Sequence, residues 1–222
     1  AKELSADGAC AFVPTMGALH AGHASLIKKA REYSDTVVVS IFINPLQFEN
    51  KDDLAKYPRT PESDIELASQ AGATHLWLPT VDEIYPGEVQ KISAGALGDI
   101  YEGVKRPGHF DGVLTVVNRL FELVKPQWAI FGEKDFQQLT LIKSMKSDVE
   151  IIGAPTIRDT DGLALSSRNV RLSDPKAALV IYRALLAASN EKSIDSAREV
   201  MRGVLASEAA FTLDYAEIIN ES

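Results

Sequence analysis

The sequence contains little of what several protein classes depend on. Its single cysteine, Cys10, excludes an internal disulfide framework and a cysteine-based zinc site, and it fits a reducing compartment. Asp and Glu outnumber Lys and Arg by 31 to 23, and this acidic balance argues against non-specific nucleic-acid binding. No apolar run approaches the length of a membrane span, and no basic-then-apolar signal peptide opens the sequence. We therefore expect a cytoplasmic protein with neither a nucleic-acid nor a membrane partner.

Short apolar runs of strand length alternate along the chain with segments of helical apolar spacing. The run at residues 36–43, TVVVSIFI, is rich in β-branched residues, which is typical of a central strand buried on both faces. Further runs occupy residues 9–13, 75–78, 128–131 and 150–154. The alternation predicts an α/β fold with a Rossmann-like, doubly wound parallel sheet.

The most informative stretch is residues 14–23, PTMGALHAGH, between the first apolar run and a predicted helix. Strand-to-helix junctions of this kind bind phosphate groups in open α/β sheets. The spacing of His20 and His23 places two imidazoles about one turn apart at the helix start. Gly22 lacks a Cβ that would block a phosphate, and we expect free helix amides and chargeable histidines to act together. Surface histidines or half of a metal site are the alternatives for such a pair.

A second junction carries more polar residues than packing requires. The apolar run at 128–131 leads directly into residues 132–138, GEKDFQQ. Lys134 can supply a point charge to a phosphate, whereas Asp135 can accept from ribose hydroxyls or cap the following helix. Gln138 lies one turn into that helix and is expected to face the same cleft. The sequence therefore predicts that this junction forms a second wall of the site.

The remaining candidates each have a simple structural alternative. Residues 166–168, Ser-Ser-Arg, suit a pyrophosphate because a guanidinium binds two oxygens at once, but they also suit a polar loop. Asn44 and Gln47 are candidate substrate contacts at the end of a strand, where turn chemistry is the alternative. Asp64 is a weak candidate metal ligand, because its place in the first turn of a predicted helix is explained by the helix dipole. His109 is more easily explained as a residue that structures its loop than as a catalytic one.

Six stretches in order resemble a single family. They are PTMGALHAGH at 14–23, FINPLQF at 42–48, YPRT at 57–60, RPGHFDGV at 106–113, GEKDFQQL at 132–139 and DGLALSSRN at 161–169. Together they resemble the pantoate–β-alanine ligases, the pantothenate synthetases of the HxGH nucleotidylyltransferase-like superfamily. The six stretches span most of the first 170 residues, whereas the His-x-Gly-His spacing alone is not specific.

The resemblance implies an AMP-forming acid–amine ligase in pantothenate biosynthesis. Pantoate and ATP would give pantoyl adenylate and diphosphate, and β-alanine would then displace AMP. The resemblance assigns His23 as the proton donor and Gln47 and Gln138 to pantoate, and it implies Mg²⁺ and a homodimer. The charge that develops on the phosphates would be stabilised by His20, His23, Lys134 and Arg168. The residues implied for ATP are Met16, Gly17, Ala18, Leu19, His20, Ala21, Gly22, His23, Gly132, Glu133, Lys134, Asp135, Ile157, Leu165, Ser166, Ser167 and Arg168.

The sequence is expected to divide into two domains. Residues 1–171 would form the Rossmann-like domain that binds ATP and pantoate, and residues 172–222 a small α+β domain that acts as a lid. Two helical segments and an apolar segment at 213–219, which resembles a strand, are predicted in the lid. Members of the family usually continue beyond the length of this sequence, so the lid is expected to be shortened.

Three other functions are compatible with parts of this pattern. A nucleotidylyltransferase would use the same histidines but retain the adenylyl group in its product. An aminoacyl-tRNA synthetase is disfavoured by the acidic charge, the size and the lack of a Lys-Met-Ser-Lys-Ser loop. A regulator that kept the fold would bind ATP without turnover.

Overall fold

The structure contains one parallel sheet and, after it, a smaller helical unit. The structure is a computed structural model, and it describes residues 9–48 and 51–219. Packing divides the chain into two compact units, Ala1–Ile157 and Arg158–Ser222. This division falls earlier than the expected boundary between residues 171 and 172, because residues before that boundary pack on a helix of the second unit.

The first unit is built on a five-stranded sheet whose strand order is β3-β2-β1-β4-β5. Every pair of neighbouring strands is parallel, and Val13 lies opposite Val39 in the central pair. This order reverses direction between β1 and β4, so the loops that follow those two strands border the crevice where open α/β sheets bind ligands. The strands are β1 (Ala11–Thr15), β2 (Val37–Ile41), β3 (His75–Trp77), β4 (Trp128–Gly132) and β5 (Glu150–Ala154). The predicted doubly wound parallel sheet is confirmed.

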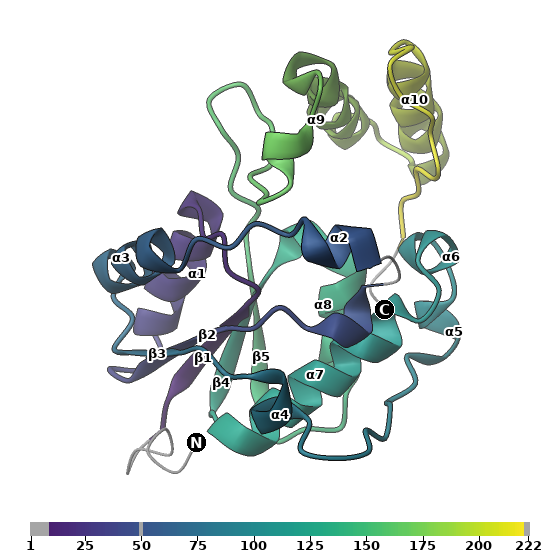
Figure 1. The fold of residues 1–222 in the computed structure, drawn as a ribbon. Helices are drawn as coiled ribbons and strands as arrows, with labels where there is room; N and C mark the ends of the chain where they lie inside the picture. The colour runs from purple at the N-terminus through teal and green to yellow at the C-terminus, as the bar shows by residue number, and fades with distance from the viewer. Residues whose placement is uncertain (1–8, 49–50, 220–222) are drawn as a thin grey trace. The chain divides into compact units, whose positions relative to one another are not determined.

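Helices cover both faces of the sheet (Figure 1). One face carries α1 (Ala21–Arg31) and α3 (Pro61–Ala71), which pack against each other. The other carries α7 (His109–Val124) and α8 (Phe136–Lys143). The shorter elements of the unit are η1 (Pro45–Gln47), α2 (Lys51–Ala55), α4 (Val81–Ile84), α5 (Gly95–Gly98), α6 (Glu102–Lys105) and η2 (Glu133–Asp135).

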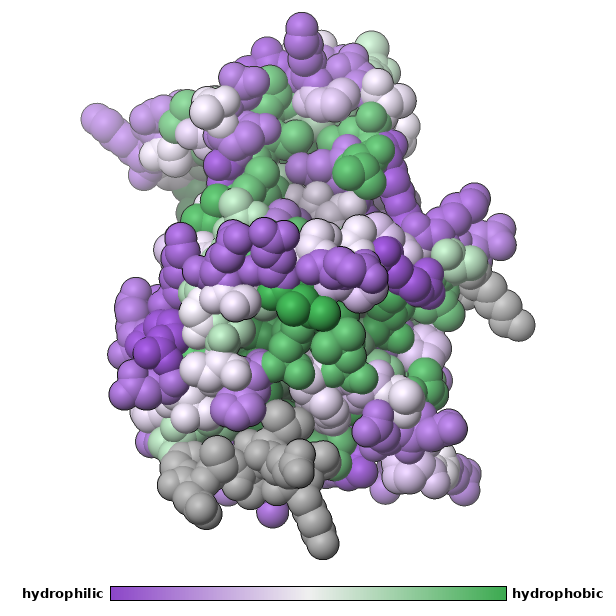
Figure 2. Space-filling view, turned by 60° about the vertical axis from the view of Figure 1, so that its left-hand side comes forward, coloured by the Kyte–Doolittle hydropathy of each residue, from purple (hydrophilic) through white to green (hydrophobic). Residues whose placement is uncertain are grey.

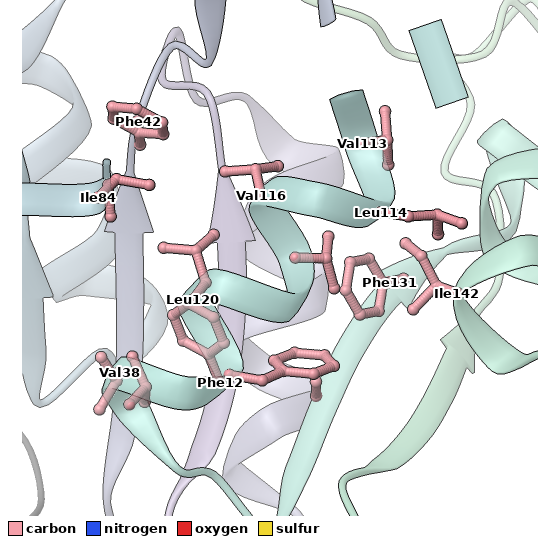
Figure 3. Close-up of a cluster of buried hydrophobic side chains, with 14 of the residues drawn as sticks. Phe12, Val38, Phe42, Ile84, Val113, Leu114, Val116, Leu120, Phe131 and Ile142 are labelled. Atoms are coloured by element: carbon pink, nitrogen blue, oxygen red, sulfur yellow. The ribbon is translucent and has the colours of Figure 1, made fainter. Parts of the chain in front are cut away.

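The β-branched run of β2 is explained by burial on both faces. Val38 packs with Phe12 and Leu120 in the cluster under α7, which Figure 3 shows from the side. Val37 and Val39 point the other way and belong to the cluster under α1 and α3. Successive strand residues face opposite sides of the sheet, so a strand between two helical layers has no face exposed to solvent. This central position fixes where β1 and β2 end, and hence where the loops after them lie.

The second unit is helical in its described part. It contains η3 (Asn169–Arg171), α9 (Pro175–Ser189) and α10 (Ile194–Ala206). Asp174 caps α9 by accepting from two backbone amides, and Pro175 occupies the first turn, where its missing N–H is not needed.

The segment before α9 packs on that helix. A Cβ on Gly162 would lie 2.0 Å from the ring of Tyr182 in α9, so only glycine allows this approach. The Arg158 guanidinium lies 4.8 Å from the centre of the same ring, within the range of a cation–π contact. These contacts explain why the packing boundary precedes residue 158.

The predicted strand at 213–219 is wrong. This apolar segment resembles a strand in sequence, but across residues 158–219 the only ladder contact is an isolated bridge between Arg158 and Ala164. Instead Arg198 of α10 donates to the Ile218 carbonyl over 2.7 Å, and Ala216 is buried against α10. The segment is therefore extended and held by a helix, because no neighbouring strand pairs with it among those residues.

The surface mixes polar and apolar residues, and Figure 2 shows hydrophobic side chains exposed among hydrophilic ones on one face. In the second unit Ile181, Leu185 and Leu186 of α9 are about half exposed. Within the part of the chain that the structure describes, no helix is long and apolar enough to cross a membrane.

We expect Gly112→Ala to destabilise the first unit. A Cβ at Gly112 would lie 2.3 Å from the Leu46 carbonyl oxygen, so α7 would have to move away from η1. Overpacking of this kind costs about 1–3 kcal/mol of the free energy of unfolding, measured by urea denaturation. Gly203→Ala in α10 is the matched control: no atom lies within 4 Å of its added Cβ, so better helix propensity should stabilise it by up to ~1 kcal/mol. Equal stability of the two variants would contradict the close approach.

Candidate functional site

Two histidines hold the start of α1 by capping it reciprocally. His20 is the N-cap residue, and its Nδ1 accepts from the Gly22 amide over 3.1 Å. The His23 Nδ1 in turn accepts from the His20 amide over 3.3 Å, and the two ring centres lie 4.2 Å apart. Because both Nδ1 atoms accept, each neutral ring carries its proton on Nε2. The spacing therefore serves the helix start and fixes two N–H donors at the same time.

Both imidazoles are neutral near pH 7. Burial lowers the pKa of His23 to about 3, with smaller contributions from His20 and the Lys134 ammonium. The pKa of His20 is also lowered, first by burial and then by Lys134. The pair was expected to carry charge, but a buried pair beside a lysine disfavours the imidazolium form. In the protein without ligands these rings are therefore hydrogen-bond donors rather than cations.

A buried carboxylate shapes the loop before His20. Asp64 in α3 is 2% exposed, and its two oxygens accept from the Ala18 amide over 3.0 Å and the Leu19 amide over 2.7 Å. The Thr60 hydroxyl donates to the same carboxylate over 3.1 Å. The loop was expected to offer free amides to a phosphate, but Asp64 uses those of Ala18 and Leu19, and the His20 ring uses that of Gly22. These three amides therefore already have protein acceptors, and the histidine side chains are the further donors at this helix start.

These partners favour a structural role for Asp64 over the predicted role as a metal ligand. Within residues 9–48 and 51–219, no group of three or more His, Cys, Asp or Glu side chains is arranged to hold a metal ion. An Asp64 whose oxygens already accept three hydrogen bonds needs no cation to compensate its charge.

The second predicted junction lies beside the first. β4 is the neighbour of β1, and η2 follows it directly with Glu133, Lys134 and Asp135. Lys134 donates to Asp135 over 2.9 Å, and its charge acts on both histidines. Gln138 is half-buried in the first turn of α8. The structure therefore brings Lys134 to the histidine pair, as the sequence predicts.

A third group of polar residues meets this loop after β2. Gln47 in η1 is 8% exposed, and its Nε2 lies 2.8 Å from the Met16 sulfur. Its Oε1 accepts from Asn44 over 3.2 Å. Asn44 itself is 1% exposed and has all its hydrogen bonds to protein groups, so it orients Gln47 rather than presenting an amide to a substrate.

The remaining predicted nucleotide contacts fall at the division of the chain. Ile157 closes the first unit, whereas Leu165 and residues 166–168 belong to the second. There the Ser166 hydroxyl accepts from the Arg168 amide over 3.2 Å.

Sequence reasoning missed Tyr85 as a contributor to the site, and it did not identify the partner of His109. Tyr85 donates from its hydroxyl to Asn44 over 2.9 Å, although 41 residues separate them, and no local pattern marks this contact. His109 was expected in a loop, but it is the first residue of α7; it is buried and donates from Nδ1 to the Gln47 carbonyl oxygen over 2.8 Å, which favours a structural over a catalytic role. The glycine-rich stretch around His109 was a signal for a loop but did not identify its partner.

The arrangement can bind anions without a dense positive charge. Two fixed Nε2–H donors and one ammonium face the ends of β1 and β4, and a primary amide stands beside the Met16 side chain. Such preoriented donors stabilise negative charge that develops on oxygen atoms in a transition state.

Comparisons with known proteins identify the family that this chain resembles. The family model described as pantoate-beta-alanine ligase matches residues 1–222. A pantothenate synthetase of Acidothermus cellulolyticus is 47% identical, and the match covers 100% of this chain and 77% of that protein. The pantothenate synthetase of Pelobacter propionicus is 43% identical, and the match covers 100% of this chain and 83% of that protein. The crystal structure of pantothenate synthetase from Thermus thermophilus has a TM-score of 0.92 at 44% identity, covering 99% of this chain and 85% of its own. The crystal structure of pantoate-beta-alanine ligase from Francisella tularensis, complexed with beta-gamma ATP and beta-alanine, has a TM-score of 0.77 at 41% identity. That match covers 88% of this chain and 78% of the other.

We expect the neutral histidine pair to make stability depend on pH. A histidine whose pKa is lowered by folding binds fewer protons in the folded than in the unfolded state, so acidification favours unfolding between its ordinary value of 6.5 and about 3. Between pH 6.5 and 5 the free energy of unfolding should fall by about 1–2 kcal/mol more in the wild type than in His23→Asn, measured by urea denaturation. His75→Asn, which changes an exposed histidine, should keep the wild-type slope. Identical slopes in all three proteins would contradict the neutral assignment.

We expect Asp64→Asn to act through folding rather than through metal binding. The substitution places an amide NH₂ against a backbone N–H, which should lower the free energy of unfolding by about 1–3 kcal/mol. The exposed Glu62→Gln in the first turn of the same helix should change it by under about 0.5 kcal/mol. A stable Asp64→Asn protein whose Mg²⁺ requirement rises would instead support the metal-ligand assignment.

Proposed function

Because the chain belongs to the pantoate-beta-alanine ligase family, we propose that it joins pantoate to β-alanine with ATP as co-substrate. The observation that carries the assignment to particular residues is the capped, neutral histidine pair at the strand-order reversal, with Lys134 beside it.

The reaction proceeds in two displacements. A pantoate carboxylate oxygen attacks the α-phosphorus of ATP, the bond to the β-phosphate oxygen breaks, and diphosphate leaves. The amine of β-alanine then attacks the acyl carbon of the adenylate, the C–O bond to AMP breaks, and the amine loses a proton as the amide forms. Adenylation is required because a carboxylate has no leaving group that an amine can displace.

The histidines and Lys134 act on the phosphates in this proposal. His20 and His23 donate from Nε2 to phosphate oxygens, and the Lys134 ammonium adds charge where diphosphate develops. The negative charge of ATP opposes the burial that keeps His23 neutral, so its pKa rises when the nucleotide binds. This rise lets His23 serve as the proton donor to the departing phosphate.

Uncharged groups position the other substrate. Gln47 and Gln138 hydrogen-bond pantoate, and Asn44 contributes by orienting Gln47 rather than by contacting the substrate directly. Asp135 accepts from the ribose hydroxyls, and Ile157, Leu165 and residues 166–168 are the further residues that we assign to ATP. We assign the second unit to the role of a lid that excludes water, because a mixed anhydride hydrolyses in water.

Among the described residues, no group of three or more His, Cys, Asp or Glu side chains is arranged to hold Mg²⁺. A Mg²⁺ ion that accompanies ATP is held mainly by the nucleotide phosphates and water, which requires few protein ligands. Use of the Mg²⁺ complex of ATP, a cytoplasmic location and homodimer formation remain predictions.

The proposal predicts which products appear with which substrates. With ATP, Mg²⁺ and pantoate, the purified protein should release diphosphate, and AMP should be released enzymatically only when β-alanine is added. His23→Ala should lower the rate of diphosphate release by about 10²–10³-fold, as for other preoriented donors. His75→Ala should leave it unchanged, since His75 is exposed at the start of β3.

Three results would contradict the proposal. Diphosphate release that does not require pantoate would exclude the ligase reaction, and a product that retains the adenylyl group would favour a nucleotidylyltransferase. ATP binding without turnover would favour a regulator. An unfolded His23→Ala protein would show that the helix cap dominates the role of His23; His23→Asn preserves an acceptor for the cap and then separates the two effects.

A further inference from the structure

The Gln47 side chain is held in place before any substrate arrives. Its Oε1 accepts from Asn44 and its Nε2 lies against the Met16 sulfur, so both ends of the carboxamide have a defined neighbour. The Gln47 backbone is held separately, since its carbonyl oxygen accepts from His109 over 2.8 Å. The side chain and the backbone are therefore positioned by different residues.

Asn44 has no capacity left for a ligand. Its Nδ2 donates to Gln47 and to the Gly112 carbonyl oxygen over 3.0 Å. Its Oδ1 accepts from the Leu46 amide over 3.2 Å and from the Tyr85 hydroxyl over 2.9 Å. An Asn side chain offers two donors and two acceptor positions, and all four are occupied here. Asn44 can therefore transmit an orientation to Gln47, and that orientation depends on what holds its Oδ1.

Tyr85 is itself held firmly enough to set that orientation. It follows α4 directly, and its ring packs edge-on against Phe42 with ring centres 6.2 Å apart. Arg119 of α7 fixes the end of α4 by donating to the Ile84 carbonyl oxygen over 2.9 Å. Burial raises the pKa of Tyr85 above its ordinary value, so its hydroxyl keeps the proton that it donates.

We propose that Tyr85 is a positioning residue for pantoate, because its hydroxyl fixes the Asn44 amide, which in turn orients the Gln47 carboxamide. This inference rests on the proposed function, in which Gln47 binds pantoate. Loss of the hydroxyl leaves Asn44 Oδ1 with only the Leu46 amide, and Gln47 then samples orientations that do not match the substrate. The effect falls on pantoate and not on ATP, since Tyr85 contacts neither the histidine pair nor Lys134 in the bonds that the structure shows.

The test is a coupling experiment on diphosphate release. Tyr85→Phe should raise the pantoate KM about threefold to tenfold while the ATP KM stays within twofold of the wild type. Gln47→Met, which removes the carboxamide at similar volume, should raise the pantoate KM by itself, and adding Tyr85→Phe to it should raise the KM no further. Tyr33→Phe is the matched control, because it deletes the same oxygen from a half-buried tyrosine that packs on Trp128.

The possible outcomes separate this inference from the proposed function. A wild-type protein that ignores pantoate overturns both. If the wild type requires pantoate, an unchanged pantoate KM in Tyr85→Phe overturns the positioning role alone. Multiplicative effects in the double variant also overturn it, since they would show that Tyr85 does not act through Gln47. Equal changes in the pantoate and ATP KM values, together with a lower melting temperature, would assign Tyr85 to general stability and contradict the proposal.

Discussion

The arrangement of the site depends on the buried Asp64 carboxylate. It ties α3 to the loop between β1 and α1, where Gly17 and Ala18 both have positive φ angles of 82° and 50°. A non-glycine residue in that region is unfavourable by about 1–3 kcal/mol unless its surroundings hold it there, and the two hydrogen bonds from Ala18 and Leu19 do so. The bend they maintain places His20 at the N-cap, so that α1 begins at Ala21. Because the Ala18 and Leu19 amides already donate to Asp64, the histidine rings are the principal donors that this loop offers to a phosphate.

The two halves of the site share one physical strategy. Hydrogen bonds from backbone amides orient His20 and His23, and a hydrogen bond from Asn44 orients Gln47. Donors with little or no net charge are therefore oriented by the protein itself. Donors that are neutral before the nucleotide binds suit a site that must hold polyphosphate and a carboxylate together, because strong fixed cations would bind both ground states tightly without favouring their reaction. Lys134 supplies the charge at one edge, where the leaving group is proposed to develop.

The sequence is informative where the chemistry is local and much less so where it depends on distant contacts. The β-branched run of β2 and the strand–helix alternation predicted the sheet, and the junctions at His20 and Lys134 were predicted to be neighbours. The neutral state of the histidines was missed, because burial and the Nδ1 contacts exist only after folding. Tyr85 was missed for the same reason, since its partner lies 41 residues away. Residues 213–219 show the converse error: an apolar segment forms a strand only when another strand pairs with it.

The contact between Gly162 and Tyr182 has a practical consequence for anyone who divides the chain. A cut between residues 171 and 172 would leave Gly162 and Arg158 on one fragment and Tyr182 on the other, so their contacts with the Tyr182 ring would be lost. A cut after Ile157 keeps that packing whole. It also assigns the proposed nucleotide contacts to different fragments, with Ile157 on the first and residues 165–168 on the second.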